Sequence, residues 1–275
     1  MSDFLIRFWG VRGSLPCPGA ATKRYGGNTP CIEVRCGDRL VILDAGTGIR
    51  EFGAALDQQG SPIDADLFLT HCHYDHVIGI PFFSPFFQPQ HRFRMWAGNL
   101  LPDFRLKEVM QSMMSEPLFP IGIDTFRADI DYRDFKAGET VKLCESVTVR
   151  TVPLNHPGGA TGYRIDYRGR SFSYITDDEW RRSKPDPQLI AIAKGTDLLI
   201  YDTPYTEAEI GAKKGWGHST WRDGVDFAKA AEAKTLCLFH HAPEHDDDAI
   251  DVLLAQARAV HPSTIAAVEG DVIRL

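Results

Sequence analysis

The chain has 275 residues, of which 43% are hydrophobic and 24% charged, a composition typical of a globular protein with a sizeable core. Its formal net charge is −7, from 30 basic and 37 acidic residues, which argues against a strong nucleic-acid surface. The N-terminus lacks a secretory pattern, no apolar run reaches membrane-spanning length, and the six scattered cysteines form no CxxC pair, so we expect a cytoplasmic protein with reduced thiols and no membrane partner.

The first half of the chain contains several short apolar runs and only two helical patterns. The runs FLIRFW, CIEVRC, RLVILDAG, ADLFLT and FRMWAG predict five strands in that order. A helix is expected over 47–59, between the third and fourth of these strands. Residues 101–120 predict a second helix that is followed by a loop and stopped by proline.

The second half of the chain also contains short apolar runs and a few helical patterns, and it includes a predicted hairpin. SVTVRTVPLNH predicts a strand, and GYRIDYRGRSFSYITDDE predicts two strands that turn at Arg168-Gly169. Strands are also expected in TDLLIYDTPY, TLCLFHHAP, TIAAVEG and DVIRL. Helices are expected over 219–233, capped by Ser219 or Thr220, and over 246–260, where acidic residues suit the first turn.

Many strands with few helices predict an α+β protein in which two sheets lie between layers of helices. No segment rich in proline, glycine or serine divides the sequence. We therefore expect one domain over residues 1–275.

Four of the predicted strands end at a residue that could bind a metal ion. ADLFLT precedes His71, VTVRTVPLN precedes His156, FSYIT precedes Asp177, and TLCLF precedes His240. Rigid strands that deliver such side chains to one edge would place them with the precision that a metal ion requires.

The stretch HCHYDH at 71–76 adds His73, Asp75 and His76 to this set. Seven candidate ligands are more than one tetrahedral zinc ion needs, so we expect two divalent ions per chain. Asp177 is the natural bridge between the ions because a carboxylate has two oxygens. Zn²⁺ is the expected ion, and Mn²⁺ and Fe²⁺ are alternatives that nitrogen and oxygen ligands also accept.

These residues resemble the metallo-β-lactamase superfamily, whose signature HxHxDH matches residues 71–76. LDAGTG at 43–48 is similar to the turn that precedes the signature, with Asp44 in a supporting position. The resemblance extends along nearly the whole chain and implies a four-layer αββα sandwich with its site along one edge of the sheets. It also implies two ligand sets, which are His71, His73 and His156 for one ion and Asp75, His76 and His240 for the other, with Asp177 bridging both.

Two features favour phosphodiester hydrolysis within this superfamily. Flavin-linked diiron members resemble HxExDH, so the histidine at position 73 favours hydrolysis over redox chemistry. GWGHST at 215–220 is similar to the HST motif of the tRNA 3′-processing endonuclease and its phosphodiesterase relatives. The resemblance makes His218 the general acid and Asp202 the residue that orients it. GHST can also be interpreted as a helix start, with Ser219 as the cap and His218 exposed.

The N-terminal stretch FWGVRGSLPCPG, with KRYGGNTPC after it, is similar to the opening of a bacterial phosphodiesterase-like branch near the cyclic-phosphate hydrolases. Loops of this kind could line a phosphate pocket with backbone N–H groups. Arg24 and Asn28 are candidate contacts for an anionic substrate. A structural turn between the first two strands is the favoured interpretation for each of them.

Further side chains lie beside the motifs. His241 and His245 are expected to support the ligands or to face solvent, because one histidine completes the second ion. Trp216 and Tyr205 flank the candidate acid and could stack on a base, although packing is an equally good interpretation.

The sequence therefore predicts a dinuclear metal-dependent hydrolase, a phosphodiesterase whose partner is a cyclic nucleotide, a cyclic phosphate or another small phosphodiester. A metal-bridging hydroxide, oriented by Asp75, would attack phosphorus, and His218 would protonate the leaving alkoxide. Hydrolysis of a carboxylic ester, thioester or lactone is the main alternative. A tRNA 3′-end endonuclease is another, although the chain lacks the Gly- and Lys/Arg-rich arm by which such members grip tRNA. A metal-bound sensor without turnover is the alternative outside the enzymes. The sequence leaves a homodimer open.

Overall fold

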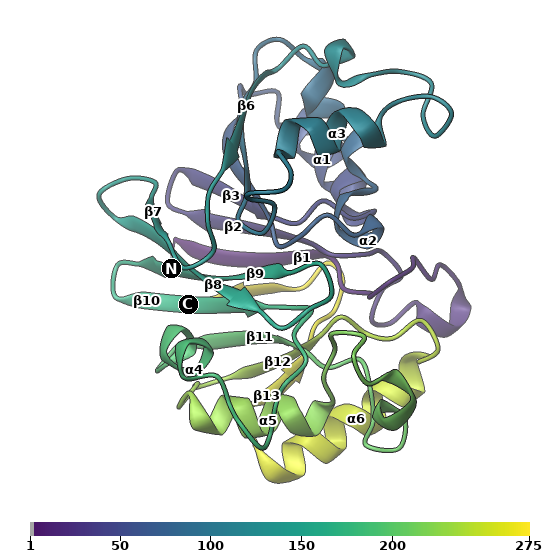
Figure 1. Cartoon of the computed structure of the whole chain (residues 1–275), viewed down its shortest axis with the longest axis vertical. Helices are drawn as coiled ribbons and strands as arrows, with labels where there is room; N and C mark the ends of the chain where they lie inside the picture. Colours follow the sequence, from purple (N-terminus) through teal and green to yellow (C-terminus); the bar gives the residue numbers. More distant parts are fainter. Residues whose placement is uncertain (1–2) are drawn as a thin grey trace.

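Residues 3–275 are described by the computed structural model, which contains two seven-stranded β-sheets. The sheets stack face to face in the middle of the molecule, and helices cover both outer faces (Figure 1). This arrangement confirms the expected α+β fold class with four layers. No helix within the described residues is both long and apolar enough to cross a membrane.

The first sheet has the strand order β14-β1-β2-β3-β4-β5-β6. Its strands are β1 (Phe4–Gly10), β2 (Cys31–Cys36), β3 (Arg39–Leu43), β4 (Asp64–Leu69), β5 (Arg92–Ala97), β6 (Asp129–Asp134) and β14 (Val272–Arg274). The helices α1 (Gly48–Gln59) and α3 (Leu106–Met113) pack on its outer face, where Phe52 and Met110 join the apolar layer. The short helix α2 (Tyr74–Val77) follows β4 and carries part of the histidine-rich motif.

The second sheet has the strand order β13-β12-β11-β10-β9-β8-β7. Its strands are β7 (Thr140–Lys142), β8 (Val147–Leu154), β9 (Ala160–Tyr167), β10 (Arg170–Ile175), β11 (Leu198–Asp202), β12 (Leu236–Phe239) and β13 (Thr264–Ala266). The helices α4 (Pro187–Ala193), α5 (Trp221–Ala230) and α6 (Asp247–Val260) lie on its outer face, in the lower half of Figure 1. Apolar side chains such as Leu189, Phe227 and Ile250 fill the layer between these helices and the sheet.

The apolar layer between the two sheets follows from alternation along the strands. In β1, Phe4, Ile6 and Phe8 are buried, and the residues between them are partly exposed. These side chains meet Tyr163 and Phe172 of the second sheet in one buried cluster. Because side chains of a strand alternate between its two faces, the apolar set of each sheet is directed into this layer.

The structure contains four helices and strands that the sequence patterns did not predict, which are α2, β6, β7 and α4. The helix expected within 101–120 occupies only Leu106–Met113. Thr220 and not Ser219 caps α5, because the Thr220 side chain accepts from the Asp223 N–H in a capping box. Short 3₁₀ turns occupy Ala20–Thr22, Ile80–Phe82, Ser84–Phe87, Ile123–Thr125 and Ile210–Lys213.

Candidate metal centre

The candidate ligands lie where parallel strands end. Strands β10, β11 and β12 are parallel neighbours, so Asp177, Asp202 and His240 emerge at the same edge of the second sheet. Strands β3 and β4 are parallel in the first sheet and bring Asp44 and His71 to its corresponding edge. The prediction that strand ends gather these side chains at one edge is therefore in agreement with the fold.

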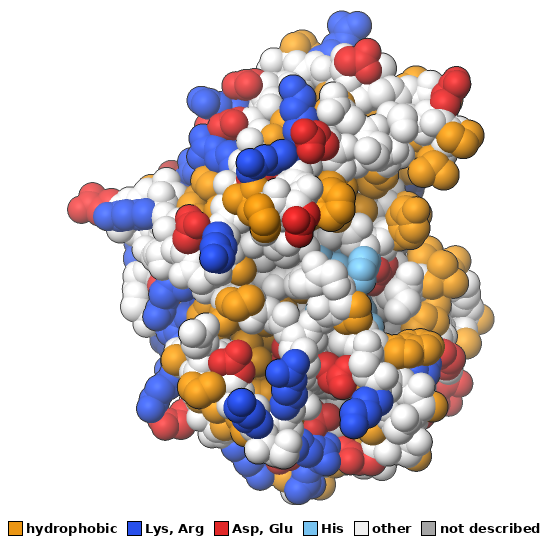
Figure 2. Space-filling view, in the orientation of Figure 1, with side chains coloured by type: hydrophobic (Ala, Val, Ile, Leu, Met, Phe, Trp, Pro, Cys, Tyr) orange, Lys and Arg blue, Asp and Glu red, His pale blue; other side chains and the backbone are white. Residues whose placement is uncertain are grey.

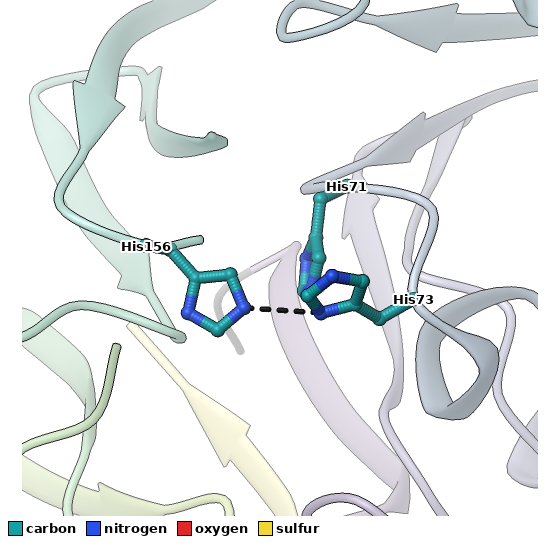
Figure 3. A group of neighbouring side chains, drawn as sticks. All are labelled: His71, His73 and His156. Carbon is teal, nitrogen blue, oxygen red and sulfur yellow. Dashed lines mark hydrogen bonds between the residues drawn. The ribbon is translucent and has the colours of Figure 1, made fainter. Parts of the chain in front are cut away.

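The first set of candidate ligands consists of His71, His73 and His156. His71 and His73 come from the segment after β4, His156 comes from the segment after β8, and their rings point toward one another (Figure 3). One ligand atom from each of the three lies within 4.8 Å of the others. His156 Nε2 is 3.1 Å from His73 Nδ1, so two ring nitrogens converge on the space that an ion would share.

The second set of candidate ligands consists of Asp75, His76 and His240, whose possible ligand atoms also lie within 4.8 Å of one another. The helical turn of α2 changes the direction of the chain after His73 and buries Asp75 and His76, while Tyr74 faces outward. Asp75 Oδ2 lies 3.2 Å from His76 Nε2 and 3.2 Å from His240 Nε2.

Asp177 lies between the two sets and directs one carboxylate oxygen toward each. Its Oδ1 is 3.8 Å from His71 Nε2 and 3.8 Å from His156 Nε2. Its Oδ2 is 3.2 Å from His76 Nε2 and 3.5 Å from His240 Nε2. This division of the two oxygens is the geometry that a bridging carboxylate requires.

The buried polar atoms fit the presence of metal ions. Nε2 of His71 and Nε2 of His76 are buried without a hydrogen bond of acceptable geometry, which is a costly state for a polar atom. Burial and the neighbouring His76 hold the pKa of His71 well below its usual range, so its imidazole is in the neutral form that binds metals. Burial likewise lowers the pKa values of His73 and His156.

The second set favours positive charge. Burial disfavours the charged form of His240, but the Asp177 carboxylate and the interactions of the His240 ring with the Asp202 and Asp75 carboxylates outweigh burial and raise the pKa of His240 to about 10. A divalent cation would supply the positive charge that these carboxylates favour. The donor set of imidazole nitrogens and carboxylate oxygens is suitable for Zn²⁺ and for other transition ions.

Asp44 positions two of the candidate ligands through hydrogen bonds. Its Oδ2 lies 2.9 Å from His76 Nδ1 and accepts a 2.8 Å hydrogen bond from the Tyr174 hydroxyl. Its Oδ1 accepts from the Thr70 N–H at 2.7 Å, and the Thr70 hydroxyl lies 3.0 Å from His71 Nδ1. Asp44 therefore fixes one histidine of each set, in the supporting position that the sequence resemblance implied.

Backbone strain is concentrated at these strand ends. Asp44, Asp177 and His240 have φ values of +60°, +59° and +64°, a region that residues other than glycine rarely adopt. Each follows a β-strand directly or after one residue, and the left-handed step turns the side chain out of the strand's alternation toward the site. Strain of this kind persists where the surrounding structure enforces it and is common at functional sites.

Asp202 connects the candidate acid with the second ligand set. Its Oδ2 lies 3.1 Å from His218 Nδ1, and its Oδ1 lies 3.1 Å from His240 Nδ1. Burial disfavours the charged form of His218, but the Asp202 carboxylate outweighs burial and raises the pKa of His218. His218 is buried and does not face solvent as the helix-start interpretation would require. The contact between Asp202 and His240 was not predicted from the sequence.

The N-terminal loop also contributes to the site. The Ser14 N–H donates to Asp75 Oδ2 at 2.8 Å, and Gly13 packs on His240 so closely that an added Cβ would lie 2.5 Å from the ring Nδ1. Arg12 is fully buried, and its guanidinium donates to the carbonyls of Gly26, Ala242 and His245. The glycine in VRGS was the sequence signal for this close approach.

Four residues whose roles could not be assigned from the sequence form contacts away from the candidate ligands. Arg24 pairs with Asp248 and Asp251, and Asn28 donates to Glu269 and accepts from Thr47, so neither side chain is directed at an anionic substrate. His241 and His245 are both buried, which corrects the expectation that they could face solvent. His241 Nε2 lies 2.9 Å from the Ala267 carbonyl, and His245 Nε2 lies 2.9 Å from Glu209.

A cleft of about 300 Å³ opens over the ligands. It is lined by Ser14, Cys72, His73, Tyr74, Asp75, Asp177 and His218. In the space-filling view, histidine side chains lie at the bottom of a hollow whose rim carries hydrophobic side chains (Figure 2). A substrate can therefore reach both ligand sets and the candidate acid from one side.

Comparisons with known proteins agree with this architecture. A model of the family described as the beta-lactamase superfamily domain matches residues 39–241. Ribonuclease Z of Archaeoglobus fulgidus is 27% identical over 315 aligned positions, which cover 96% of this chain and 95% of that protein. The alignment is longer than the 275 residues of this chain, so that ribonuclease Z carries segments that are absent here.

Two solved structures share the fold. The metallo-beta-lactamase fold protein YhfI from Bacillus subtilis superposes with a TM-score of 0.74 at 18% identity, over 99% of each chain. A diphosphatase from the PhnP family superposes with a TM-score of 0.72 at 20% identity, over 99% of this chain and 98% of that one.

Proposed function

Because the chain belongs to the beta-lactamase superfamily, we propose that it is a dinuclear metal-dependent phosphodiesterase that acts on a small phosphodiester such as a cyclic nucleotide or cyclic phosphate. The observation that carries this proposal is the position of His218, which is held by Asp202 at 3.1 Å beside the bridging Asp177. An acid at this place is needed when the leaving group is a basic alkoxide.

The proposed ligands are His71, His73 and His156 for one ion, Asp75, His76 and His240 for the other, and Asp177 for both. The ions, which we propose to be Zn²⁺, would polarise the phosphoryl oxygens and acidify a water molecule. The ligands come from both sheets, which supports the expectation that residues 1–275 form one hydrolase domain. All six cysteines are unpaired, which supports a cytoplasmic location.

The side chains of the protein position the nucleophile and move the proton. Asp75 uses Oδ2 toward His76, His240 and the Ser14 N–H, and no hydrogen bond within residues 3–275 engages its Oδ1. Oδ1 can therefore accept a hydrogen bond from the attacking water and orient it. His218 donates through Nδ1 to Asp202, so its Nε2–H is the group that protonates the leaving oxygen.

A tRNA 3′-end endonuclease is the second candidate, because the similar protein of Archaeoglobus fulgidus is a ribonuclease Z. We favour the smaller substrate for two reasons. The relative has segments that this chain lacks, and the chain carries a net charge of −7, which would repel an extended polyanion. Thioester hydrolysis is disfavoured because a thiolate leaving group does not need the His218–Asp202 pair. An ester or lactone also has an alkoxide leaving group, so the relative activity on ester and phosphodiester substrates distinguishes that alternative.

Hydrolysis of bis(p-nitrophenyl) phosphate tests the proposed reaction. The purified protein is expected to release p-nitrophenolate, to lose this activity after treatment with a chelator, and to regain it when Zn²⁺ or Mn²⁺ is added back. The same preparation should hydrolyse p-nitrophenyl acetate much more slowly. Activity on the acetate alone, or phosphodiester hydrolysis that survives complete metal removal, would contradict the proposal.

A further inference from the structure

The turn Gly215-Trp216-Gly217 presents an exposed indole immediately before the candidate acid. Trp216 is 55% exposed, whereas Tyr205, the other aromatic residue beside His218, is only 5% exposed. The rings of Tyr205 and His218 have centroids 5.9 Å apart in an edge-to-face contact. Of the two aromatic residues that the sequence offered for stacking on a base, Tyr205 therefore packs within the protein and Trp216 remains accessible.

The backbone of this turn is fixed at each of its three residues. The N–H groups of Gly215 and Gly217 both donate to Glu179 Oε2, at 2.8 and 3.2 Å. The Trp216 N–H donates to the Lys213 carbonyl at 3.1 Å. The two glycines have φ values of +83° and +84°, which side-chain-bearing residues rarely adopt. The indole is thus presented by a preorganised backbone, which lowers the entropy cost of binding a ligand.

The turn also contacts the first ligand set. The Gly217 carbonyl lies 3.0 Å from His156 Nδ1, and a Cβ at Gly217 would lie 2.1 Å from the same nitrogen. Because consecutive Cα atoms are about 3.8 Å apart, the backbone of Trp216 is held close to both His156 and His218. A single exposed apolar residue needs no special explanation, but one held in this way beside an acid does.

Lys213 adds a positive charge at the indole. Its Nζ lies 5.0 Å from the centre of the Trp216 ring and 4.6 Å from that of the Tyr205 ring, and it pairs with Glu244 at 3.0 Å. Cation–π contacts of this kind hold the cation over an aromatic face. More than half of the Trp216 surface remains exposed and is available to a planar ligand.

We propose that Trp216 is a specificity-determining residue that stacks on the base of a nucleoside leaving group, so the substrate is a nucleotide-type phosphodiester. This inference rests on the proposed function. His218 must face the leaving oxygen to protonate it, and His218 is part of the cleft lining. A nucleoside that extends from this oxygen beyond the cleft can therefore reach Trp216, which lies two residues before His218 and outside the lining. Every nucleobase offers a flat π-face, and stacking on an aromatic side chain is a general mode of binding single nucleotides.

The test compares adenosine 2′,3′-cyclic phosphate with 1-O-methylribose 2′,3′-cyclic phosphate, two substrates that differ only in the base. The wild-type protein is expected to have a higher kcat/KM for the nucleotide. Trp216→Ala should reduce this ratio by about 5- to 150-fold, the range that corresponds to one stacked base. Trp216→Phe keeps a ring and should retain most of the preference.

Two controls accompany this comparison. Val252→Ala removes a side chain of equal exposure on α6 and should leave the ratio unchanged. Adenosine 5′-monophosphate should quench tryptophan fluorescence in the wild type but not in Trp216→Phe. An unchanged ratio in Trp216→Ala, with bis(p-nitrophenyl) phosphate still hydrolysed, would overturn the stacking role alone. Absence of any phosphodiester hydrolysis by the metal-loaded wild type would instead overturn the proposed function.

Discussion

Replacing Asp177 with alanine is expected to remove both metal ions and nearly all hydrolytic activity together. Each oxygen of this carboxylate faces a different ligand set, at 3.8 Å from two nitrogens of the first and at 3.2 and 3.5 Å from two nitrogens of the second. Burial favours the protonated form of Asp177, but the imidazoles of His240 and His76 outweigh burial and hold its pKa well below the usual range. The negative charge at this position is therefore the feature that both ions share. Elemental analysis and the rate on bis(p-nitrophenyl) phosphate measure the two losses.

Asp178→Asn is the matched control for this variant. Asp178 is adjacent in sequence, but its oxygens accept from the Asn155 N–H and the Tyr201 hydroxyl, on the side away from the ligands. Asparagine can still accept from the Asn155 N–H through its amide oxygen, and its NH₂ group can donate to the Tyr201 hydroxyl oxygen, so metal content should be retained. Removal of a residue that only orients a ligand should cost on the order of 10–100-fold, less than the loss of Asp177. Retention of two ions and near-normal turnover in Asp177→Ala would refute the bridging role.

His218→Ala is expected to discriminate between leaving groups. An alkoxide is strongly basic and needs a proton, so hydrolysis of a ribose or alkyl phosphodiester should slow by roughly 10²–10⁴-fold. p-Nitrophenolate is stable without a proton, so the rate on bis(p-nitrophenyl) phosphate should fall much less. Metal content should be unchanged, because His218 is outside the proposed ligand sets. Equal losses on both substrates would show that His218 binds substrate or metal and is not an acid.

His261→Ala is a suitable control for His218→Ala, because His261 is partly buried and its side chain hydrogen-bonds only with Thr264 among the described residues. Asp202→Asn should show a weaker form of the same leaving-group selectivity, since Asp202 positions the acid. This variant should also weaken binding of the metal ion by the second set, because Asp202 Oδ1 lies 3.1 Å from His240 Nδ1. If Asp202→Asn loses the leaving-group selectivity but keeps its full metal content, the contact between Asp202 and His240 is not needed for metal binding.

The architecture and the ligand types could be predicted because each depends on a short, continuous sequence pattern. Strands such as β1 alternate buried and partly exposed residues, and the candidate ligands follow apolar runs directly. β6 was missed because it is an edge strand with the sequence DIDYRD, in which charge obscures the apolar alternation. α4 was missed although Asp186 followed by Pro187 is a helix-start signal, because the helix has only seven residues.

The contacts that complete the site could not be predicted because they join distant segments. Ser14 contacts Asp75 only after the first sheet has assembled, and Asp202 contacts His240 only after β11 and β12 have paired in the second sheet. The sequence HHAPEH offered three histidines as neighbours of the second ion. The positive φ of His240 turns that side chain alone toward the ligands, while His241 Nε2 lies against the Ala267 carbonyl.

A crystal structure of the zinc-loaded protein with inorganic phosphate, recorded with anomalous data at the zinc edge, tests the central claim most directly. We predict two anomalous peaks, one within each ligand set, with Asp177 Oδ1 bound to one ion and Oδ2 bound to the other. The phosphate should lie in the cleft with an oxygen within hydrogen-bond distance of His218 Nε2. A single peak at full occupancy in a crystal of active protein, or an Asp177 carboxylate that contacts only one ion, would contradict the account.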